Sequence, residues 1–304
     1  MTTDINSKAL RSWLFIDGAD EAALAEGPTS EADVLIQELE DFTPPEMRPR
    51  AREISPGVLA AWKAAGVVTA VRVNPLDGDG MADLTAIMRG APDIVMLPKT
   101  AAPRHIVELA GAIARCEADY GLEIGSTAIV PNIEQAVGVL QTFAICGASN
   151  RVIACGVASE DMAADLGAER GRDGLEMAYV RERFHVECVA AGSVSLDCPY
   201  TWTDLEGVTA ETQHARRLGY TGKLAVHHAH PPVINRLLTP SDTEVAEAGR
   251  IVAAFEAARA AGKARADLDG SLIEVPIYLT AKRLLDRAAL FSSPHNGRRT
   301  RSKP

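Results

Sequence analysis

The sequence lacks any long hydrophobic run. No segment reaches the roughly 18 apolar residues that a membrane-spanning helix requires, and the first residues, MTTDINSKALRSW, lack the apolar core of a secretion signal. Basic charge is also scarce, since 31 lysines and arginines stand against 41 aspartates and glutamates. These absences predict a cytoplasmic protein that binds neither membranes nor nucleic acid. They do not exclude a ligand that carries phosphate, because such a ligand needs only a local basic patch.

Cysteine is sparse and irregularly spaced. The five cysteines are odd in number and form no C-x-x-C pair, and Cys155 and Cys198 lie in apolar runs. This pattern predicts buried, reduced thiols and a reducing compartment.

Eight short apolar runs recur along the chain, separated by segments with helical spacing. They do not alternate with polar residues, which is typical of strands buried on both faces. The strand–helix alternation predicts a (β/α)8 TIM barrel, although a doubly wound open sheet gives a similar pattern. The runs cover residues 12–16, 33–36, 68–73, 94–97, 126–130, 151–155, 193–196 and 223–226.

The pattern changes after the eighth run. Ser241 and Glu244 are placed as a capping box ahead of an amphipathic helix, which is followed by the Gly-containing loop AGKARADLDGS and a final helix. We therefore predict a barrel domain over residues 1–237 and a small C-terminal helical appendage over 238–290. The remaining segment, 291–304, is rich in Pro, Gly, Ser and basic residues and predicts a disordered tail.

Polar residues follow every predicted strand, at the end where parallel barrels carry their active sites. Loops are polar in any case, so a single position carries little weight. Arg72 carries more, because it lies inside an apolar strand and needs a carboxylate from the protein or from a substrate. The set comprises Asp17, Glu38, Glu40, Asp41, Arg72, Asn74, Lys99, Asn132, Glu134, Glu160, Asp161, Asp197, His227 and His228.

Two of these carboxylates, Glu134 and Asp161, follow neighbouring strands and are able to share one hard cation. Mg²⁺ prefers oxygen ligands, usually one or two carboxylates completed by water and substrate. The crowding of Glu38, Glu40 and Asp41 at one strand end fits a nearby cation. Alternatively, these acids pair with the three arginines that follow them, and spacing alone leaves both readings open.

Seven segments, in order, resemble the successive motifs of the HpcH/HpaI aldolase and citrate lyase β-subunit family, which includes malyl-CoA and citramalyl-CoA lyases. The segments are VLIQELEDFTPPEMRPRAR, VRVNPLDGDG, VMLPKT, IVPNIEQAVGV, GVASEDMAADLG, DLEG and GYTGKLAVHHAH. The resemblance extends from Arg11 to about Ala289. It implies a (β/α)8 barrel, Mg²⁺ (or Mn²⁺) as cofactor, and a homotrimer or homohexamer.

The resemblance also implies roles for particular residues. Glu134 and Asp161 match the metal carboxylates of the family. Glu40 and Asp41 match the acidic pair that holds waters of the metal shell. Arg72 matches the arginine that grips the carboxylate of the keto acid, a bidentate task suited to a planar guanidinium. Lys99 matches the lysine of the family's LPK motif, at the same rim.

Three departures from the family pattern bear on substrate and reaction. Asp17 ends the first strand where relatives typically read LFVPG, and His227-His228-Ala229-His230 replaces a single His-Pro. Glu274 replaces the family's Asp, the acid/base group that a neighbouring subunit supplies. The histidine run is interpreted as rim-lining or hydrogen-bonded rather than as a zinc site, because its spacing is too close and no cysteine is near.

The predicted function is Mg²⁺-dependent cleavage of a malyl-, methylmalyl- or citramalyl-type 3-hydroxyacyl-CoA into glyoxylate or pyruvate and an acyl-CoA. The candidate catalytic residues are Arg72, Glu40, Asp41 and Glu274, and the candidate substrate-binding residues are Arg72, Lys99, Asp17 and Asn74. A thioesterase, a CoA-independent aldolase on the same barrel, and a β subunit that works only inside a citrate lyase complex are the alternatives.

Overall fold

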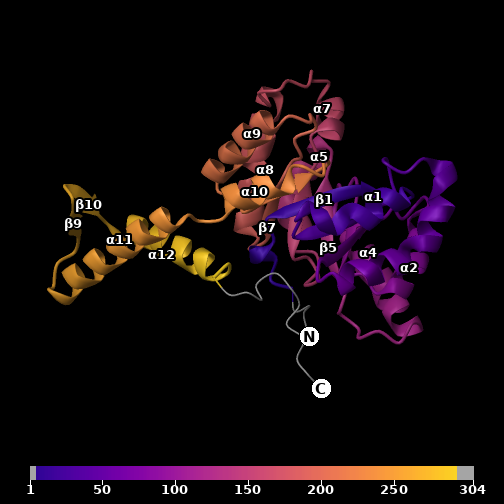
Figure 1. Cartoon of the computed structure of the whole chain (residues 1–304), viewed down its shortest axis with the longest axis horizontal. Coiled ribbons are helices and arrows are strands. Elements are labelled where there is room, and N and C mark those ends of the chain that lie inside the picture. Colours follow the sequence, from indigo (N-terminus) through magenta and orange to yellow (C-terminus); the bar gives the residue numbers. More distant parts are fainter. Residues whose placement is uncertain (1–4, 293–304) are drawn as a thin grey trace. The chain divides into compact units, whose positions relative to one another are not determined.

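The computed structural model describes residues 5–292. The first unit is a closed barrel of eight parallel strands in sequence order, ringed by helices (Figure 1). β1 pairs with both β2 and β8, which closes the sheet and confirms the predicted barrel over an open sheet. The strands are β1 (Ser12–Asp17), β2 (Val34–Glu38), β3 (Val68–Arg72), β4 (Ile94–Leu97), β5 (Ala128–Ile133), β6 (Ala154–Val157), β7 (Val194–Asp197) and β8 (Gly222–Ala225).

The helices of this unit follow the strands. They are α1 (Glu21–Glu26), α2 (Arg48–Ala64), α3 (Gly80–Ile87), α4 (Pro103–Asp119), α5 (Ala136–Val139), α6 (Thr142–Cys146), α7 (Glu160–Leu166), α8 (Ala178–Ala190), α9 (Leu205–Leu218) and α10 (Pro231–Leu238). Within the described chain, none of the helices combines the length and apolar character that crossing a bilayer would take.

Every second residue of each strand fills the barrel interior. Trp13, Val34, Ile36, Ala70 and Met96 belong to one buried apolar cluster there. Because side chains alternate between the two faces of a strand, the inward set can be followed along each strand to its carboxyl end. The next inward positions after this apolar layer are polar, and they form the mouth of the barrel.

Two predicted strands were placed too early, at 126–130 and 151–155. The reason is a buried ion pair in which Arg151 donates to the Glu117 carboxylate at 2.6 Å. The same carboxylate accepts hydrogen bonds from the backbone N–H groups of Gly125 and Thr127, at 2.9 and 3.0 Å. These contacts hold the residues before β5, and Arg151 itself, in loops. β5 therefore begins two residues later than predicted, and β6 begins three residues later.

The expectation that Asp197 lies at the rim is wrong. Its neighbour Leu196 belongs to the interior cluster, so Asp197 points outward to the helices, where it is fully buried. There its carboxylate accepts hydrogen bonds from Arg181 at 2.8 and 2.9 Å and from Lys223 at 2.5 Å. Asp197 therefore ties α8 and β8 to the end of β7, and it does not serve the cavity.

Removing Asp197 should destabilise the barrel strongly. The variant Asp197→Ala leaves the buried Arg181 and Lys223 without their shared partner, and we expect the free energy of unfolding to fall by about 3–5 kcal/mol. Urea unfolding followed by circular dichroism measures it. Glu53→Ala, which removes one partner of the exposed Arg50, is the control and should change little. Equal losses in the two variants would contradict this account.

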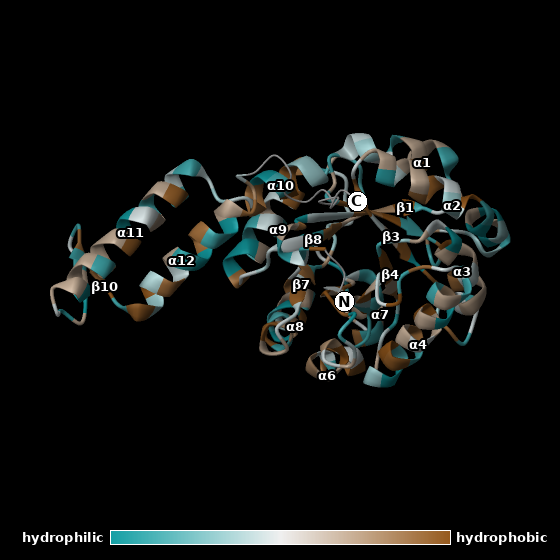
Figure 2. Cartoon of the chain, turned by 90° about the horizontal axis from the view of Figure 1, so that it is seen from below, coloured by the Kyte–Doolittle hydropathy of each residue, from teal (hydrophilic) through white to brown (hydrophobic). Residues whose placement is uncertain are grey.

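The second compact unit begins at Leu237, within the last turn of α10. Its helices, α11 (Asp242–Ala260) and α12 (Val275–Ala289), carry hydrophobic and hydrophilic residues along their lengths (Figure 2), and the predicted capping box at the start of α11 is present. Phe255 and Tyr278 stack at 4.6 Å between ring centroids, next to the buried Ile273. The tail predicted at 291–304 lies almost wholly outside the described residues.

The segment predicted as a loop in this unit is a β-hairpin, β9 (Ala266–Leu268) and β10 (Ser271–Ile273). Its turn consists of Asp269 and Gly270, with φ of 53° and 78°. Positive φ at both central residues is the geometry of the tight turns that match the twist of a hairpin, and Asp-Gly is a favoured pair for it. The Asp269-Gly270 pair is therefore a local sequence signal for this hairpin.

Candidate active site

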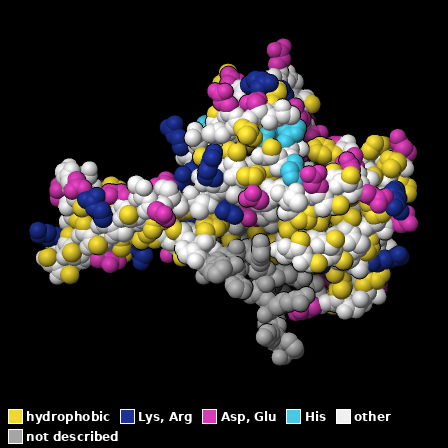
Figure 3. All heavy atoms as spheres, viewed as in Figure 1, with side chains coloured by type: hydrophobic (Ala, Val, Ile, Leu, Met, Phe, Trp, Pro, Cys, Tyr) yellow, Lys and Arg dark blue, Asp and Glu magenta, His cyan; other side chains and the backbone are white. Residues whose placement is uncertain are grey.

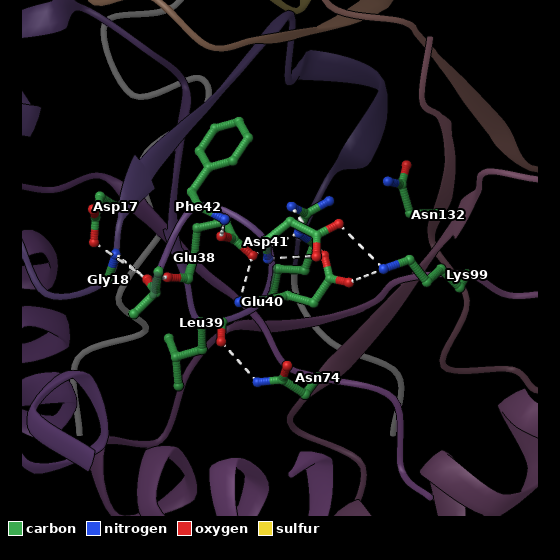
Figure 4. Close-up of polar contacts among 12 residues, drawn as sticks. Asp17, Gly18, Glu38, Leu39, Glu40, Asp41, Phe42, Asn74, Lys99 and Asn132 are labelled. Carbon is green, nitrogen blue, oxygen red and sulfur yellow. Dashed lines mark hydrogen bonds and ion pairs between the residues drawn. The ribbon is translucent and has the colours of Figure 1, made fainter. Parts of the chain in front are cut away.

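The segment of residues 38–43, which starts at the last residue of β2 and is here called the acidic loop, is folded back on one carboxylate. Glu38 is fully buried and accepts hydrogen bonds from the backbone N–H groups of Glu40 and Phe42, at 2.7 and 2.6 Å. The hydroxyl of Thr43 donates to the Glu38 carbonyl at 2.5 Å and accepts from Gly18 N–H at 2.9 Å. These bonds fix the turn and place Glu40 and Asp41 at the mouth (Figure 4).

Arg72, the last residue of β3, lies at the centre of this mouth. Its Nε donates to Glu38 at 2.8 Å, while the two terminal nitrogens make longer contacts, 3.3 Å to Glu40 and 3.5 Å to Glu134. Burial lowers the pKa of Arg72, but the carboxylates of Glu38, Glu134 and Glu40 outweigh it and raise the pKa overall. The guanidinium is therefore permanently charged, and its terminal N–H groups are the less firmly held ones.

Two phenylalanines flank the guanidinium. The Phe15 ring from β1 lies 4.8 Å from the guanidinium carbon of Arg72 and the Phe42 ring of the acidic loop lies 5.7 Å from it. Such cation–π contacts add attraction and restrict the plane of the guanidinium. Neither phenylalanine, nor Glu38 as the hub of the loop, was among the predicted site residues.

Glu134 follows β5 at an inward position, and one of its two carboxylate oxygens accepts no hydrogen bond in the described part of the chain. Its Oε1 accepts from Asn132 at 2.6 Å, whereas Oε2 is buried and has no hydrogen-bond partner among residues 5–292. Burial raises the pKa of Glu134 to about 7, against the effect of Arg72, and the charges of Asp161 and Glu40 raise it further. A buried oxygen without a donor, beside a second carboxylate, is the arrangement that a cation satisfies.

The local charge balance points the same way. Five carboxylates gather with only two cations, so the fully ionised mouth carries an excess of negative charge that a divalent cation would offset. The five acids offer only oxygen ligands, which suits a hard ion such as Mg²⁺. The acids are Glu38, Glu40, Asp41, Glu134 and Asp161, and the cations are Arg72 and Lys99.

Lys99 reaches from the end of β4 to the acidic loop. Its ammonium contacts Glu40 and lies 3.1 Å from Asp41, and its backbone has a left-handed φ of 49°. The turn is held by Thr100, whose N–H donates to Asn132 O at 3.1 Å. Backbone strain of this kind in a non-glycine residue is common at functional sites. Burial lowers the pKa of Lys99, but Glu40 and Asp41 raise it on balance, so the side chain stays cationic.

A cavity of about 540 Å³ opens at this mouth. Asp17, Asp41, Arg72, Asp161 and His227 are among the residues that line it, which brings four predicted site residues to one space. Its walls are completed by apolar side chains of β1, β8 and the acidic loop. The volume suits a small organic acid with part of a larger ligand, and the mixture of apolar walls with a few charged groups is typical of substrate sites.

Two predicted site residues are placed differently. Asn74 donates its side-chain amide to Leu39 O and to the Asp83 carboxylate, both at 2.7 Å, and is thereby committed to holding the acidic loop. Glu274 belongs to the second unit, where it is half exposed and lies 3.6 Å from Arg265.

The histidine run divides, because the rings of His227 and His230 meet edge to face with centroids 5.0 Å apart, whereas His228 contacts Thr29. His227 bonds Thr201 O at 2.9 Å and His228 bonds the Thr29 hydroxyl at 3.3 Å. Burial, followed by the proximity of His227, lowers the pKa of His230 to about 4 and keeps its ring neutral. Histidine side chains lie beside acidic ones on one face of the first unit (Figure 3).

Comparison with known proteins places this site in a family. The model of the HpcH/HpaI aldolase/citrate lyase family matches residues 11–228, most of the chain. The chain belongs to this family. The match includes every candidate site residue except Glu274.

Within the HpcH/HpaI family, the chain is 32% identical to the citrate lyase subunit beta of Escherichia coli strain K12, over 93% of this chain and 95% of the relative. It is 28% identical to a (3S)-malyl-CoA thioesterase of Cereibacter sphaeroides, over 91% and 94%. The crystal structure of Mycobacterium tuberculosis CitE in complex with magnesium, acetoacetate and coenzyme A has a TM-score of 0.73 and 25% identity, over 93% and 99%. Full-length relatives of this family thus include both a lyase subunit and a thioesterase.

Metal affinity should depend on pH through Glu134. With its pKa raised to about 7 by burial, this carboxyl is largely protonated below neutral pH and must lose that proton to bind a cation. We expect Mg²⁺ affinity to fall about tenfold per pH unit below 7 and to level off above it. Calorimetric titrations at several pH values measure this. A flat profile between pH 5.5 and 8 would contradict the placement of Glu134 in a cation site.

Proposed function

We propose that this protein is a Mg²⁺-dependent carbon–carbon lyase that cleaves a 3-hydroxyacyl-CoA into a 2-keto acid and an acyl-CoA. The observation that carries the proposal is the meeting of Arg72, Glu134 and Asp161 at one barrel mouth that opens on a cavity. Membership of the HpcH/HpaI family and similarity to a citrate lyase subunit beta support this reaction class.

In this proposal Arg72 holds the carboxylate of the keto-acid portion. Its Nε donates to Glu38 at 2.8 Å. The terminal nitrogens lie farther from their partners, at 3.3 and 3.5 Å, so their N–H groups can bind the carboxylate of an incoming substrate. A guanidinium presents two parallel N–H groups to a carboxylate, which fixes the orientation as well as the position of the acid.

Glu134 and Asp161 would hold the metal ion. The unpartnered Oε2 of Glu134 and the half-buried Asp161 supply two carboxylates, the number that Mg²⁺ sites usually take from the protein. Bound there, the ion would act as a Lewis acid that favours negative charge on a substrate oxygen. Asn132 donates to the other oxygen of Glu134 at 2.6 Å and so orients the carboxylate.

Cleavage breaks the bond between the carbinol carbon and the carbon next to the thioester. The hydroxyl proton passes to a base, the electron pair of the broken bond moves to the thioester's α-carbon, and an acid protonates that carbon. We assign proton transfer at the mouth of the barrel to Glu40 and Asp41. Burial raises the pKa of Glu40, which helps it to hold a proton, and Lys99 keeps the pair in place.

The protonation of the acyl-CoA product is assigned to Glu274. This role requires the second unit of a neighbouring copy, so the proposal includes a homotrimer or homohexamer, and sedimentation measures the oligomeric state. Glutamate at this position moves the carboxyl by one methylene relative to aspartate, and a displacement of about 1 Å can cost a hundredfold in rate.

A thioesterase is the second candidate. It is favoured by the (3S)-malyl-CoA thioesterase relative and by Asp17, an additional carboxylate that lines the cavity and accepts from Thr43 at 3.2 Å. A carboxylate near the thioester is suited to activating water.

One assay separates the candidates. The purified chain, with Mg²⁺, is given malyl-, methylmalyl- and citramalyl-CoA, and keto acid and free thiol are measured in parallel. Equal amounts of keto acid and acyl-CoA without thiol support the lyase, and thiol without keto acid supports the thioesterase. Keto acid from free hydroxy-keto acids indicates an aldolase. Activity only with an acyl-carrier partner indicates a subunit of a larger complex. Chelation should abolish and Mg²⁺ restore the signal.

A further inference from the structure

Three cysteines from separate elements meet on the outer side of the barrel. Cys146 ends α6, Cys155 lies on β6 and Cys188 lies in the last turn of α8. Ala154 belongs to the barrel interior, so its neighbour Cys155 points outward to the helices. All three residues are buried, and their sulfur atoms lie within 4.8 Å of one another. The sequence separation of these cysteines gave no sign of this cluster.

The spacing of the sulfurs is close to that of a metal site. With a Zn–S distance of about 2.3 Å, a tetrahedral ion holds its thiolates about 3.8 Å apart. Sulfurs within 4.8 Å reach that spacing by small side-chain rotations. The cluster is also closed, because Cys155 and Cys188 are fully buried and none of the three lines a cavity described above.

A fourth ligand is available beside the cluster. The hydroxyl of Ser193 is buried and lies near the Cys146 sulfur. Cys188 also lies in the last turn of α8, a helix of 13 residues, where the partial negative charge of the backbone carbonyls favours a cation. A buried hydroxyl oxygen thus lies beside one of the three sulfurs.

A neighbouring set of potential ligands shows the contrast. Asp197, Cys198 and Glu211 also bring their ligand atoms within 4.8 Å of one another. There, however, Arg181 and Lys223 already neutralise the carboxylates through contacts of 2.5–3.0 Å. That set needs no ion, whereas the thiol cluster offers three soft ligands and a nearby hydroxyl.

We propose that Cys146, Cys155 and Cys188 bind one thiophilic d10 cation, with Zn²⁺ as the ion to test and the Ser193 hydroxyl as fourth ligand. On binding, three S–H bonds break, three S–Zn bonds form and three protons pass to solvent. The ion would tie α6 and α8 to β6, the strand that leads to Asp161. Its role is structural, because a closed four-ligand site leaves no position for a substrate.

The full chain, purified under reducing conditions from zinc-supplemented cells, is analysed for metal by mass spectrometry. We expect about one zinc per chain that survives dialysis, and its loss in Cys188→Ala and in Cys146→Ser. Cys116→Ala is the matched control, since Cys116 is a buried cysteine outside the cluster, and it should keep the zinc. Replacement by Co²⁺ should give thiolate-to-metal charge-transfer absorption in the unmodified chain, and this absorption should be lost with Cys155→Ser.

Four results would overturn the proposal. The first is an unmodified chain without zinc that also shows no thiolate absorption with Co²⁺. The second is zinc that persists in the Cys146 and Cys188 variants. The third is a disulfide between two of the three cysteines in the freshly reduced and purified protein, with no metal. Loss of zinc from Glu134→Gln would likewise assign the ion to the cavity and not to the thiols.

Discussion

Replacing Arg72 with lysine should remove almost all turnover while the barrel stays folded. Lysine keeps the positive charge among Glu38, Glu40 and Glu134 but cannot present two parallel N–H groups to a carboxylate. We expect kcat/KM to fall by about 10²–10⁴-fold, the equivalent of about 3–5 kcal/mol of transition-state stabilisation.

This loss is measured by steady-state kinetics on the thioester that the assay identifies, with thermal unfolding as the test of folding. Arg50→Lys is the matched control, because Arg50 also contacts two carboxylates, those of Glu21 and Glu53, but is exposed on α2. It should keep full activity. If Arg72→Lys also kept it, the proposed grip on the substrate carboxylate would be wrong.

Replacing Glu134 with glutamine should abolish Mg²⁺ binding and reduce activity to background. Glutamine keeps the shape and the acceptor for Asn132 but loses the charge that a hard cation requires. The metal-free variant should be no less stable than the parent at pH 8. Burial raises the pKa of Glu134 from 4.5 to about 7, so the charged form costs stability as pH rises through that window, on the order of 3 kcal/mol.

Thermal unfolding with and without Mg²⁺ measures both effects. The parent should gain stability from the ion, and Glu134→Gln should gain none. Glu160→Gln is the control for metal binding, because Glu160 is an exposed acid beside Asp161 that pairs with Arg170. Unchanged stabilisation of Glu134→Gln by Mg²⁺ would place the ion elsewhere.

The barrel could be predicted because its strands are short continuous apolar runs separated by helices. The predicted element boundaries were wrong where long-range polar contacts determine the backbone conformation. The starts of β5 and β6 depend on Glu117, which captures Arg151 and two backbone N–H groups from across a turn. The hairpin in the second unit was missed because only its turn, Asp269-Gly270, has a local signal, and its strands are three residues each.

The candidate site was predictable in composition but not in organisation. Glu38, Arg72, Asn132 and Glu134 lie two or four residues beyond inward-facing apolar positions of their strands, which is why they share the mouth. The same period of two places Asp197 outward, so this error was avoidable. The central role of Glu38 was not predictable, because it depends on bonds to its own loop and to Arg72 on the adjacent strand.

Because the Glu38 carboxylate accepts hydrogen bonds from both the acidic loop and the Arg72 guanidinium, the positions of these two parts are coupled. An insertion in the loop would tilt the arginine, and a shift of the arginine would disturb the loop. A change of substrate specificity is therefore easier through substitutions at cavity-lining positions outside the acidic loop and Arg72. His227, which lines the cavity and contacts Thr201 O and the His230 ring but no part of the acidic loop in the described contacts, is such a position.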